Sequence, residues 1–385
     1  MNVYDNTVSI AKCDSYDEFE YALKTALEVF GGIQSFINEG DVVAIKPNCV
    51  RGLKPEIGGT THPETVRTVV NLIRKCGATP IIVESPGGPS TKAYVKSIFR
   101  TCGILAVAEQ ENVEIIYEQD VVECTVENSQ VTKKVSVLKK LVEADKIISL
   151  SKPKPHGMQV YTGAVKNMFG AIIGTDKVRY HMEHPDYQNF ANTVIDIYNC
   201  VKPTLNIMDA VVTMHKSGPT SGVPYKGNML LVGTNAFAVD RVALKLIDVD
   251  VNDVYVMKTA TEKGLVCADE NLQVYRDGMQ LGSLKQADLT NNVFDGYILP
   301  LSTEQRKSGF LIGFVNVISK FAKTKPVFSK KKCKKCGVCI KSCPAKCLEI
   351  KPGDKRLTID LDKCIRCFCC EELCPETAVK IRRYF

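Results

Sequence analysis

The sequence predicts an α/β fold: a mostly parallel sheet with helices on both faces, followed by a small α+β domain at the C-terminus. In the first 250 residues, short continuous apolar segments alternate with segments of helical spacing. This alternation is typical of parallel strands covered on both faces. Ten of the 17 cysteines then fall between Cys333 and Cys374, which marks the end of the chain as a separate unit.

Each strand is expected where a short apolar run occurs, and each helix where apolar residues recur at helical spacing. The expected strands are residues 8–13, 41–47, 80–84, 113–117, 146–150, 205–208 and 229–232. The expected helices are residues 16–37, 63–76, 91–109, 161–169, 187–201, 236–247 and 254–263. Ligands of parallel sheets bind beyond the C-terminal strand ends, so the loops after Ile45, Val83, Leu150 and Asp209 should hold the site.

Polar side chains gather in those loops, most densely between Lys152 and Gly170. Lysines around one imidazole attract an anion, and a neutral His156 could act as general acid. Lys166 would pair with the anion, and Asn167 would donate hydrogen bonds to it. These three residues are the expected catalytic group. The expected substrate-binding residues are Lys46, Asn48, Lys152, Thr162, Gly163 and Asp209.

Several of these signals have a second interpretation. Thr162 and Gly163 open a predicted helix whose free N–H groups could bind an anion, or Gly163 could simply allow close helix packing. The loop from Gly218 to Gly222 could cradle an anion or form a tight turn. His181 to His184 could be a metal corner or a polar loop. Cys49 could be a reactive thiol or a small buried hydrophobe.

The cysteine-rich segment is an internal repeat with an offset of 31 residues, and each copy reads C-x2-C-x2-C-x3-C-P. This spacing is that of two-cluster iron–sulfur proteins, in which the fourth cysteine of each run ligates the other cluster. We therefore expect two 4Fe-4S clusters. One would be held by Cys333, Cys336, Cys339 and Cys374, and the other by Cys364, Cys367, Cys370 and Cys343. Two zinc sites are the alternative, although zinc sites usually pair two C-x2-C motifs.

Two resemblances extend this interpretation. The last 55 or so residues resemble the bacterial two-cluster ferredoxin domain, which implies one-electron transfer at low potential. Residues 5–290 resemble the family called domain of unknown function 362, through KPN, THP, KPKPHG…TGAVKNMFG and D…GPTSG. That family is often fused to such a ferredoxin, which implies an anaerobic redox setting.

A more distant likeness is to the N-terminal domain of nickel-pincer lactate racemases. It rests on His156 and Lys166, ten residues apart, with His181 or His184 in place of a later histidine. Here Val165 and Asn167 flank the lysine, where the racemases have glycines, and only His62 is a loose counterpart of an earlier histidine. The likeness implies shared ancestry rather than a shared cofactor.

Charge and composition limit the kinds of partner that the protein is expected to bind. The net charge is +7, but residues 320–385 carry 18 Lys+Arg and 7 Asp+Glu. This basic tail favours an acidic redox partner over nucleic acid, because its few aromatic residues do not alternate with basic ones. No apolar run reaches the length of a membrane span, and residues 1–10 do not resemble a signal peptide, so a cytoplasmic location is expected.

We expect an α/β domain over residues 1–300, a linker with a docking helix over 301–328, and a ferredoxin domain over 329–385. The docking helix, which would pack the C-terminal domain onto the α/β domain, is expected at residues 308–325. The alternative is a basic amphipathic helix that lies on a membrane surface. The expected function is iron–sulfur electron transfer that serves the α/β domain. The alternative is an anaerobic oxidoreductase that reduces a small anion or a bound cofactor near His156 and Lys166. Whether the α/β domain holds flavin or nickel stays open.

Overall fold

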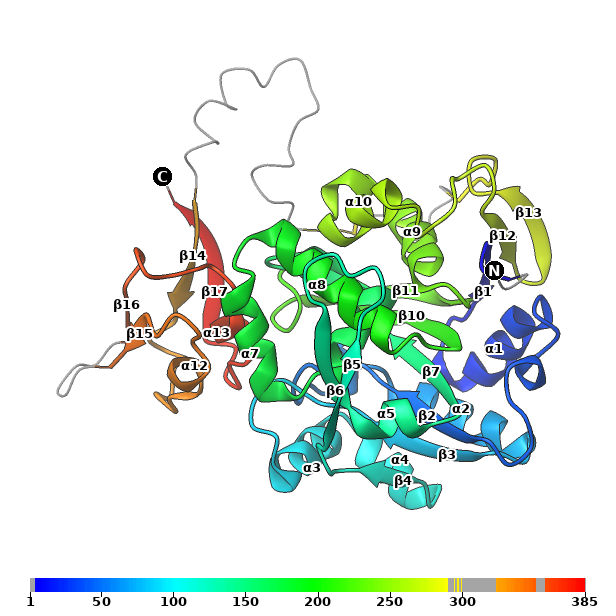
Figure 1. The fold of residues 1–385 in the computed structure, drawn as a ribbon, viewed down its shortest axis with the longest axis horizontal. Coiled ribbons are helices and arrows are strands. Elements are labelled where there is room, and N and C mark those ends of the chain that lie inside the picture. Colours follow the sequence, from blue (N-terminus) through cyan, green and yellow to red (C-terminus); the bar gives the residue numbers. More distant parts are fainter. Residues whose placement is uncertain are drawn as a thin grey trace, which may run out of the picture.

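The computed structural model describes residues 4–289, 294, 296–297, 299, 323–350 and 357–384. Within these residues a nine-stranded sheet has the order β13-β12-β1-β11-β10-β7-β2-β3-β4 (Figure 1). Its strands are β1 (Thr7–Lys12), β2 (Val42–Lys46), β3 (Thr79–Val83), β4 (Glu114–Ile116), β7 (Lys146–Ser151), β10 (Leu205–His215), β11 (Val223–Gly233), β12 (Gln273–Arg276) and β13 (Met279–Ser283).

The sheet is mostly parallel, as predicted. Neighbouring strands from β10 through β7, β2 and β3 to β4 all run in the same direction. Strand β11 is antiparallel to both of its neighbours, β10 and β1. Because the parallel strands end at one edge, the loops that follow β2, β3 and β7 lie together there.

Helices cover both faces of the sheet, which explains why the strands are apolar throughout (Figure 1). One face packs against α1 (Phe19–Glu28), α2 (Pro63–Lys75), α3 (Lys92–Thr101) and α4 (Ile104–Gln110). The other packs against α6 (Ala164–Asn167), α8 (Tyr187–Cys200), α9 (Ala236–Leu246) and α10 (Tyr255–Glu262). The remaining body elements are α5 (Lys139–Glu143), α7 (Gly174–Glu183), the hairpin of β5 (Val121–Thr125) and β6 (Lys134–Leu138), and the hairpin of β8 (Lys154–His156) and β9 (Val160–Thr162).

Several expected elements differ from the structure. The helix expected over 16–37 ends at Glu28, because Gly31 and Gly32 soon after it adopt φ of 81 and 85. The helix expected over 91–109 is two helices, because Gly103 adopts φ +78 between them. The helix expected over 161–169 begins as strand β9 and becomes helical only at Ala164. Asp209 does not end its strand, since β10 continues to His215 in a long hairpin with β11.

The C-terminal domain contains β14 (Lys323–Phe328), α12 (Val338–Lys341), β15 (Leu348–Glu349), β16 (Thr358–Ile359), α13 (Cys369–Glu372) and β17 (Val379–Tyr384). The sequence repeat is also a backbone repeat. Lys335 and Arg366, 31 residues apart, have φ of 55 and 56, and Lys346 and Thr377 have φ of 47 and 46.

The expected boundary of this domain needs correction. Strand β14 pairs with β17 along its whole length, so residues 323–328 belong to the ferredoxin domain rather than to a linker. Strand geometry there also excludes the helix expected to end at residue 325. The rest of the expected docking helix, up to residue 322, lies outside the described residues.

A candidate redox site between the two domains

A cavity of ≈ 690 Å³ lies where the C-terminal domain meets the parallel strand ends. Four parts of the chain line it: the loops after β2 and β3, the segment from His156 to His181, Pro219 in the loop between β10 and β11, and helix α13 with the residue after it. Figure 1 shows α13 and β17 beside α7, which contributes Lys177 and His181 to the lining. The ferredoxin domain therefore forms one wall of the cavity.

Close contacts hold this wall in place. The Arg51 guanidinium donates to the carbonyl oxygen of Cys374, and Thr220 Oγ1 donates to that of Glu371 at 3.5 Å. Gly157 lets the two domains approach, because a Cβ there would lie 2.6 Å from Ile381 Cδ1 and 3.1 Å from a ring carbon of Phe368. A side chain at this position would therefore have to displace the end of Ile381 and press on the Phe368 ring.

His156 and Glu372 meet across this contact. His156 Nδ1 accepts from the backbone N–H groups of Met158 and Gln159, at 3.1 Å each, so the ring proton resides on Nε2. Nε2 lies 3.0 Å from Glu372 Oε1. Burial and the Lys166 charge lower the pKa of His156, which keeps the ring neutral. Burial alone would raise the pKa of Glu372, but His156, Lys166 and His181 together lower it to about 2.

Lys166 faces the cavity without a partner. Its side chain is partly exposed there, 5.4 Å from the centre of the Phe169 ring, and in the described part of the chain nothing forms a hydrogen bond or ion pair with its ammonium group. Burial lowers its pKa, while Glu372 opposes the change. Two further cavity atoms, Thr162 Oγ1 and His181 Nδ1, are buried without a hydrogen-bond partner in the described chain.

Lys177, on α7 of the body, is the second ammonium group that lines the cavity. It donates to the carbonyl oxygens of Ser85, at 2.7 Å, and Ile172, and it lies 6.0 Å from the Phe169 ring centre. Burial lowers the pKa of Lys177 to about 7. The cavity thus presents an unpaired ammonium, a hydroxyl and an imidazole nitrogen, together with a lysine poised to gain or lose a proton. Such groups suit a small ligand with anionic oxygen atoms.

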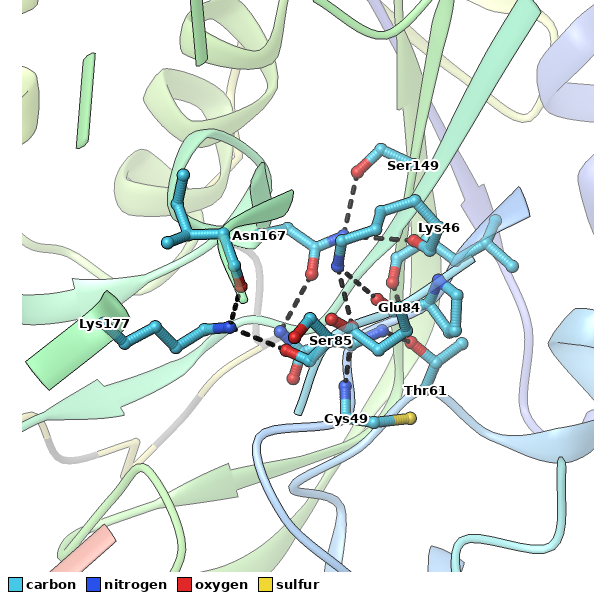
Figure 2. Close-up of polar contacts among 12 residues, drawn as sticks. Lys46, Cys49, Thr61, Glu84, Ser85, Ser149, Asn167 and Lys177 are labelled. Carbon is cyan, nitrogen blue, oxygen red and sulfur yellow. Dashed lines mark hydrogen bonds and ion pairs between the residues drawn. The ribbon is translucent and has the colours of Figure 1, made fainter. Parts of the chain in front are cut away.

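Beneath the cavity, the strand ends are joined by a buried polar network (Figure 2). Lys46 forms an ion pair with Glu84 at 2.7 Å. Asn167 donates to Ser149 Oγ at 2.9 Å, and Asn48 donates to Asn167 Oδ1 at 2.9 Å. Asn48 and Asn167 line the cavity, whereas the ammonium of Lys46 is held by Glu84. The network fixes these side chains before any ligand arrives.

Lys152 and Asp209 lie away from the cavity, in contrast to the expectation. They form a fully buried ion pair at 2.8 Å. Tyr16 completes the group, since its hydroxyl donates to Asp209 Oδ1 at 3.0 Å and accepts from Lys152 at 3.0 Å. Neither charged side chain is available to a ligand, because each is already paired in the core.

The start of α6 is also occupied. Asp240, on α9, accepts from the N–H groups of Ala164 at 2.7 Å and Val165 at 3.0 Å. A Cβ on Gly163 would lie 1.9 Å from Asp240 Oδ1. The free N–H groups expected here for an anion therefore serve the Asp240 carboxylate, and Gly163 provides the close approach.

The metal corner expected as one interpretation of His181 to His184 is not formed. The His181 ring is buried and stacks on Phe190, with centres 4.2 Å apart and planes 9° apart. Across the described residues, no three His, Cys, Asp or Glu side chains come together closely enough to hold a single metal ion; the cysteines of the C-terminal domain instead lie around larger cavities.

Two smaller cavities lie inside the ferredoxin domain, and the cysteines divide between them. One of ≈ 380 Å³ is lined by Cys333, Cys336, Cys339 and Cys374. The other, of ≈ 330 Å³, is lined by Cys343, Cys364, Cys367, Cys370 and the additional Cys347. The fourth cysteine of each run faces the cavity of the other run. Four thiols around a cavity are the donor set of an iron–sulfur cluster.

The fold and these cavities define a two-part redox protein, an α/β body joined to an iron–sulfur domain. Residues 325–375 match the 4Fe-4S dicluster domain. Residues 43–245, more than half of the chain, match the family described as Domain of unknown function (DUF362), and the chain belongs to that family. No helix among the described residues is both long and apolar enough to cross a membrane.

One curated relative is the Thylakoid-associated protein sll1697 of Synechocystis sp. (strain ATCC 27184 / PCC 6803 / Kazusa). It is 28% identical over 262 residues, which cover 67% of this chain and 80% of that protein. Among solved structures, the lactate racemase apoprotein of Thermoanaerobacterium thermosaccharolyticum matches with a TM-score of 0.40 and 13% identity, over 62% of this chain and 57% of that chain. A structural-genomics protein of Thermotoga maritima matches with a TM-score of 0.38 and 12% identity, over 65% and 60%. The chain thus spans less than two thirds of either solved structure.

Of the expected site residues, the cavity brings together Asn48, His156, Thr162, Lys166 and Asn167. Sequence reasoning missed Lys177, which lies in a helix that was not expected, and Cys369 and Glu372, which come from the other domain. The one available signal was that Cys369 and Glu372 stand among cluster cysteines without a ligand role of their own.

Proposed function

We propose that this protein is an iron–sulfur oxidoreductase that passes electrons from its ferredoxin domain to a small anionic molecule in the interdomain cavity. One observation carries the proposal: the cavity is lined by Cys369 and Glu372 on one side and by Lys166 on the other. Cys369 lies between Cys367 and Cys370, so a molecule in the cavity would lie beside cluster ligands. A docking domain alone would need no such cavity.

The thiol sets would hold two 4Fe-4S clusters, the first at Cys333, Cys336, Cys339 and Cys374 and the second at Cys343, Cys364, Cys367 and Cys370. When bound, such clusters supply single electrons at low potential. No further cofactor is assigned to the body.

The body residues would bind and orient the electron acceptor. Lys166 would pair with an anionic oxygen, and Thr162 Oγ1 and His181 Nδ1 would complete the binding set. An acceptor that gains electrons gains negative charge, and Lys166 would offset that charge. A lysine whose pKa is lowered by burial is also suited to supplying a proton.

Both ring nitrogens of His156 are engaged, so we propose that it acts on the ligand through Glu372. By contacting the Glu372 carboxylate at 3.0 Å, His156 would keep it out of a direct ion pair with Lys166, so that the ammonium can pair with the ligand. Asn48 and Asn167 would hold the floor of the site in place.

The test compares Lys166→Met with a matched control, Lys258→Met on the exposed surface of α10. Anaerobically purified protein is titrated calorimetrically with reducible small carboxylates, namely 2-oxo and α,β-unsaturated acids, and with phosphate, which can bind but cannot be reduced. Dithionite-reduced protein is then mixed with any anion that binds. We expect one class of anion to reoxidise the clusters, and Lys166→Met to weaken its binding roughly tenfold or more. Iron content should be unchanged.

Two outcomes would refute the proposal. One is that no anion reoxidises the reduced protein, which would leave an electron carrier. The other is that Lys166→Met binds the reoxidising anion as tightly as the control.

A further inference from the structure

The two cysteine cavities of the ferredoxin domain differ in their access to solvent. In the first set, Cys336 is exposed and Cys333 and Cys339 are partly exposed. In the second set, Cys367 and Cys370 are each only 8% exposed. Cys374 of the first set is also 8% exposed, and Cys343 and Cys364 of the second set are partly exposed. The first set therefore contains one exposed thiol and one buried thiol, whereas the second set contains two buried thiols and no exposed one, so it is the more buried set.

The buried set is the one beside the interdomain cavity. Cys369, which lines that cavity, lies between Cys367 and Cys370. Phe368 lines the second cysteine cavity and also packs on Gly157, next to His156. The first set meets the body through Cys374, whose carbonyl oxygen accepts from Arg51.

Basic residues surround the exposed set. Lys330, Lys331, Lys332, Lys334 and Lys335, here named the lysine rim, are all exposed. Lys334 and Lys335 also line the first cysteine cavity. Lys334 forms an ion pair with Glu376 at 3.0 Å, and Lys330, Lys331 and Lys332 add three exposed positive charges to the same surface. A patch of one sign attracts a partner of the opposite sign and speeds its association.

We infer that an acidic one-electron carrier protein docks on the lysine rim and delivers electrons to the cluster at Cys336, from which they pass to the cluster at Cys370 and then to the cavity. This inference rests on the proposed function for its last step only. Each encounter oxidises one carrier by one electron and reduces this protein by one electron. A two-electron reduction in the cavity therefore consumes two carriers.

The test of the docking surface uses the full chain with both clusters. The probe is a plant-type 2Fe-2S ferredoxin of net negative charge, reduced before mixing. The variant is Lys330→Glu/Lys331→Glu, and the matched control is Lys258→Glu/Lys263→Glu, which makes the same charge change at exposed sites on and after α10.

At low ionic strength we expect the second-order rate of cluster reduction to fall roughly tenfold or more in the rim variant and to change little in the control. The difference should largely vanish at about 0.5 M salt, where charges are screened over a few ångströms. Calorimetric affinity for oxidised ferredoxin should fall in parallel. Reduction by dithionite, which needs no docking, should be equal in all three proteins. Equal rates in rim variant and control, or no salt dependence, would overturn the inference.

The order of the two clusters is tested with Cys336→Ala and Cys370→Ala, after iron determination. Loss of the cluster at Cys336 should block reduction by ferredoxin while dithionite still reduces the other cluster. Loss of the cluster at Cys370 should leave reduction by ferredoxin intact. The reverse pattern would refute the order, and if neither variant holds iron, the rim variants decide the inference. Because these readouts need no cavity ligand, they stand even if no anion reoxidises the protein.

Discussion

Replacing Glu372 with glutamine should weaken the contact between the two domains. The carboxylate is 15% exposed and lies 3.0 Å from His156. The folded protein lowers its pKa from 4.5 to about 2, in spite of the opposing effect of burial. That displacement corresponds to about 3 kcal/mol in favour of the ionised side chain. Glutamine keeps the size and one acceptor but removes the charge, so we expect the free energy of unfolding to fall by about 2–3 kcal/mol at pH 7.

The pH dependence of this effect has a definite sign. Because the pKa of Glu372 is lower in the folded than in the unfolded protein, its contribution is fully present above about pH 4.5 and is lost as the pH falls toward 2. The stability difference between wild type and Glu372→Gln should therefore be constant from pH 6 to pH 8. Urea unfolding followed by cluster absorbance and by circular dichroism measures it.

Glu376→Gln is the matched control, with the same chemical change four residues along. Glu376 pairs with Lys334 at 3.0 Å, but the two side chains are 31% and 73% exposed. Exposed pairs contribute little, so the control should lose less than about 1 kcal/mol. If both variants lose the same amount, or if the Glu372→Gln difference grows between pH 6 and pH 8, the account of the domain contact is wrong.

Asp209→Asn should lower stability by roughly 3–5 kcal/mol in urea unfolding, because it leaves the Lys152 ammonium buried without a counter-charge, and adding Lys152→Met should recover part of the loss. Iron analysis of Cys369→Ser should show unchanged iron content, whereas Cys370→Ser should lose iron; equal losses would contradict the ligand sets. Burial lowers the pKa of His181 to about 3, so only the unfolded protein binds this proton near pH 6.5, and stability should fall as the pH drops from 6.5 toward 5. His181→Phe should flatten that fall, by about 1.4 kcal/mol per pH unit; a slope unchanged from wild type would exclude His181 as its source.

The alternation of apolar strands with helices predicted the α/β architecture because buried parallel strands must be apolar on both faces. Its failures were local. The spacing of residues 161–169 predicts a helix, but β9 pairs with β8 before the helix begins. This pairing joins two strands, and the spacing of residues along one segment does not reveal it. The charge of Asp209 after an apolar run predicts the end of a strand. In the structure the carboxylate lies inside the core, where it pairs with Lys152 and accepts a hydrogen bond from Tyr16.

The sequence predicts only part of the candidate site. Lys166, His156 and Asn167 belong to one dense polar block, and chain proximity alone brought them together. Glu372 stands more than 200 residues away, in another domain, and nothing in its neighbourhood marks it as the partner of His156. The roles of Lys46 and Gly163 were likewise decided by neighbours distant in sequence, Glu84 and Asp240.

Residue types and their spacing along the chain predict the α/β class, the two cysteine runs and the residues able to bind iron or an anion, since each of these depends on one segment of the chain. Which charges are paired and which remain free depends on tertiary packing, because ion pairs such as Lys152 with Asp209, and contacts such as that of His156 with Glu372, join segments far apart in the chain. Packing also places the cavity between the domains, with Cys369 in its lining and Cys336 exposed to water. Burial and pairing depend on how the whole chain packs. In the described part of the chain, they leave Lys166 as the lysine of the cavity whose ammonium has no hydrogen bond or ion pair.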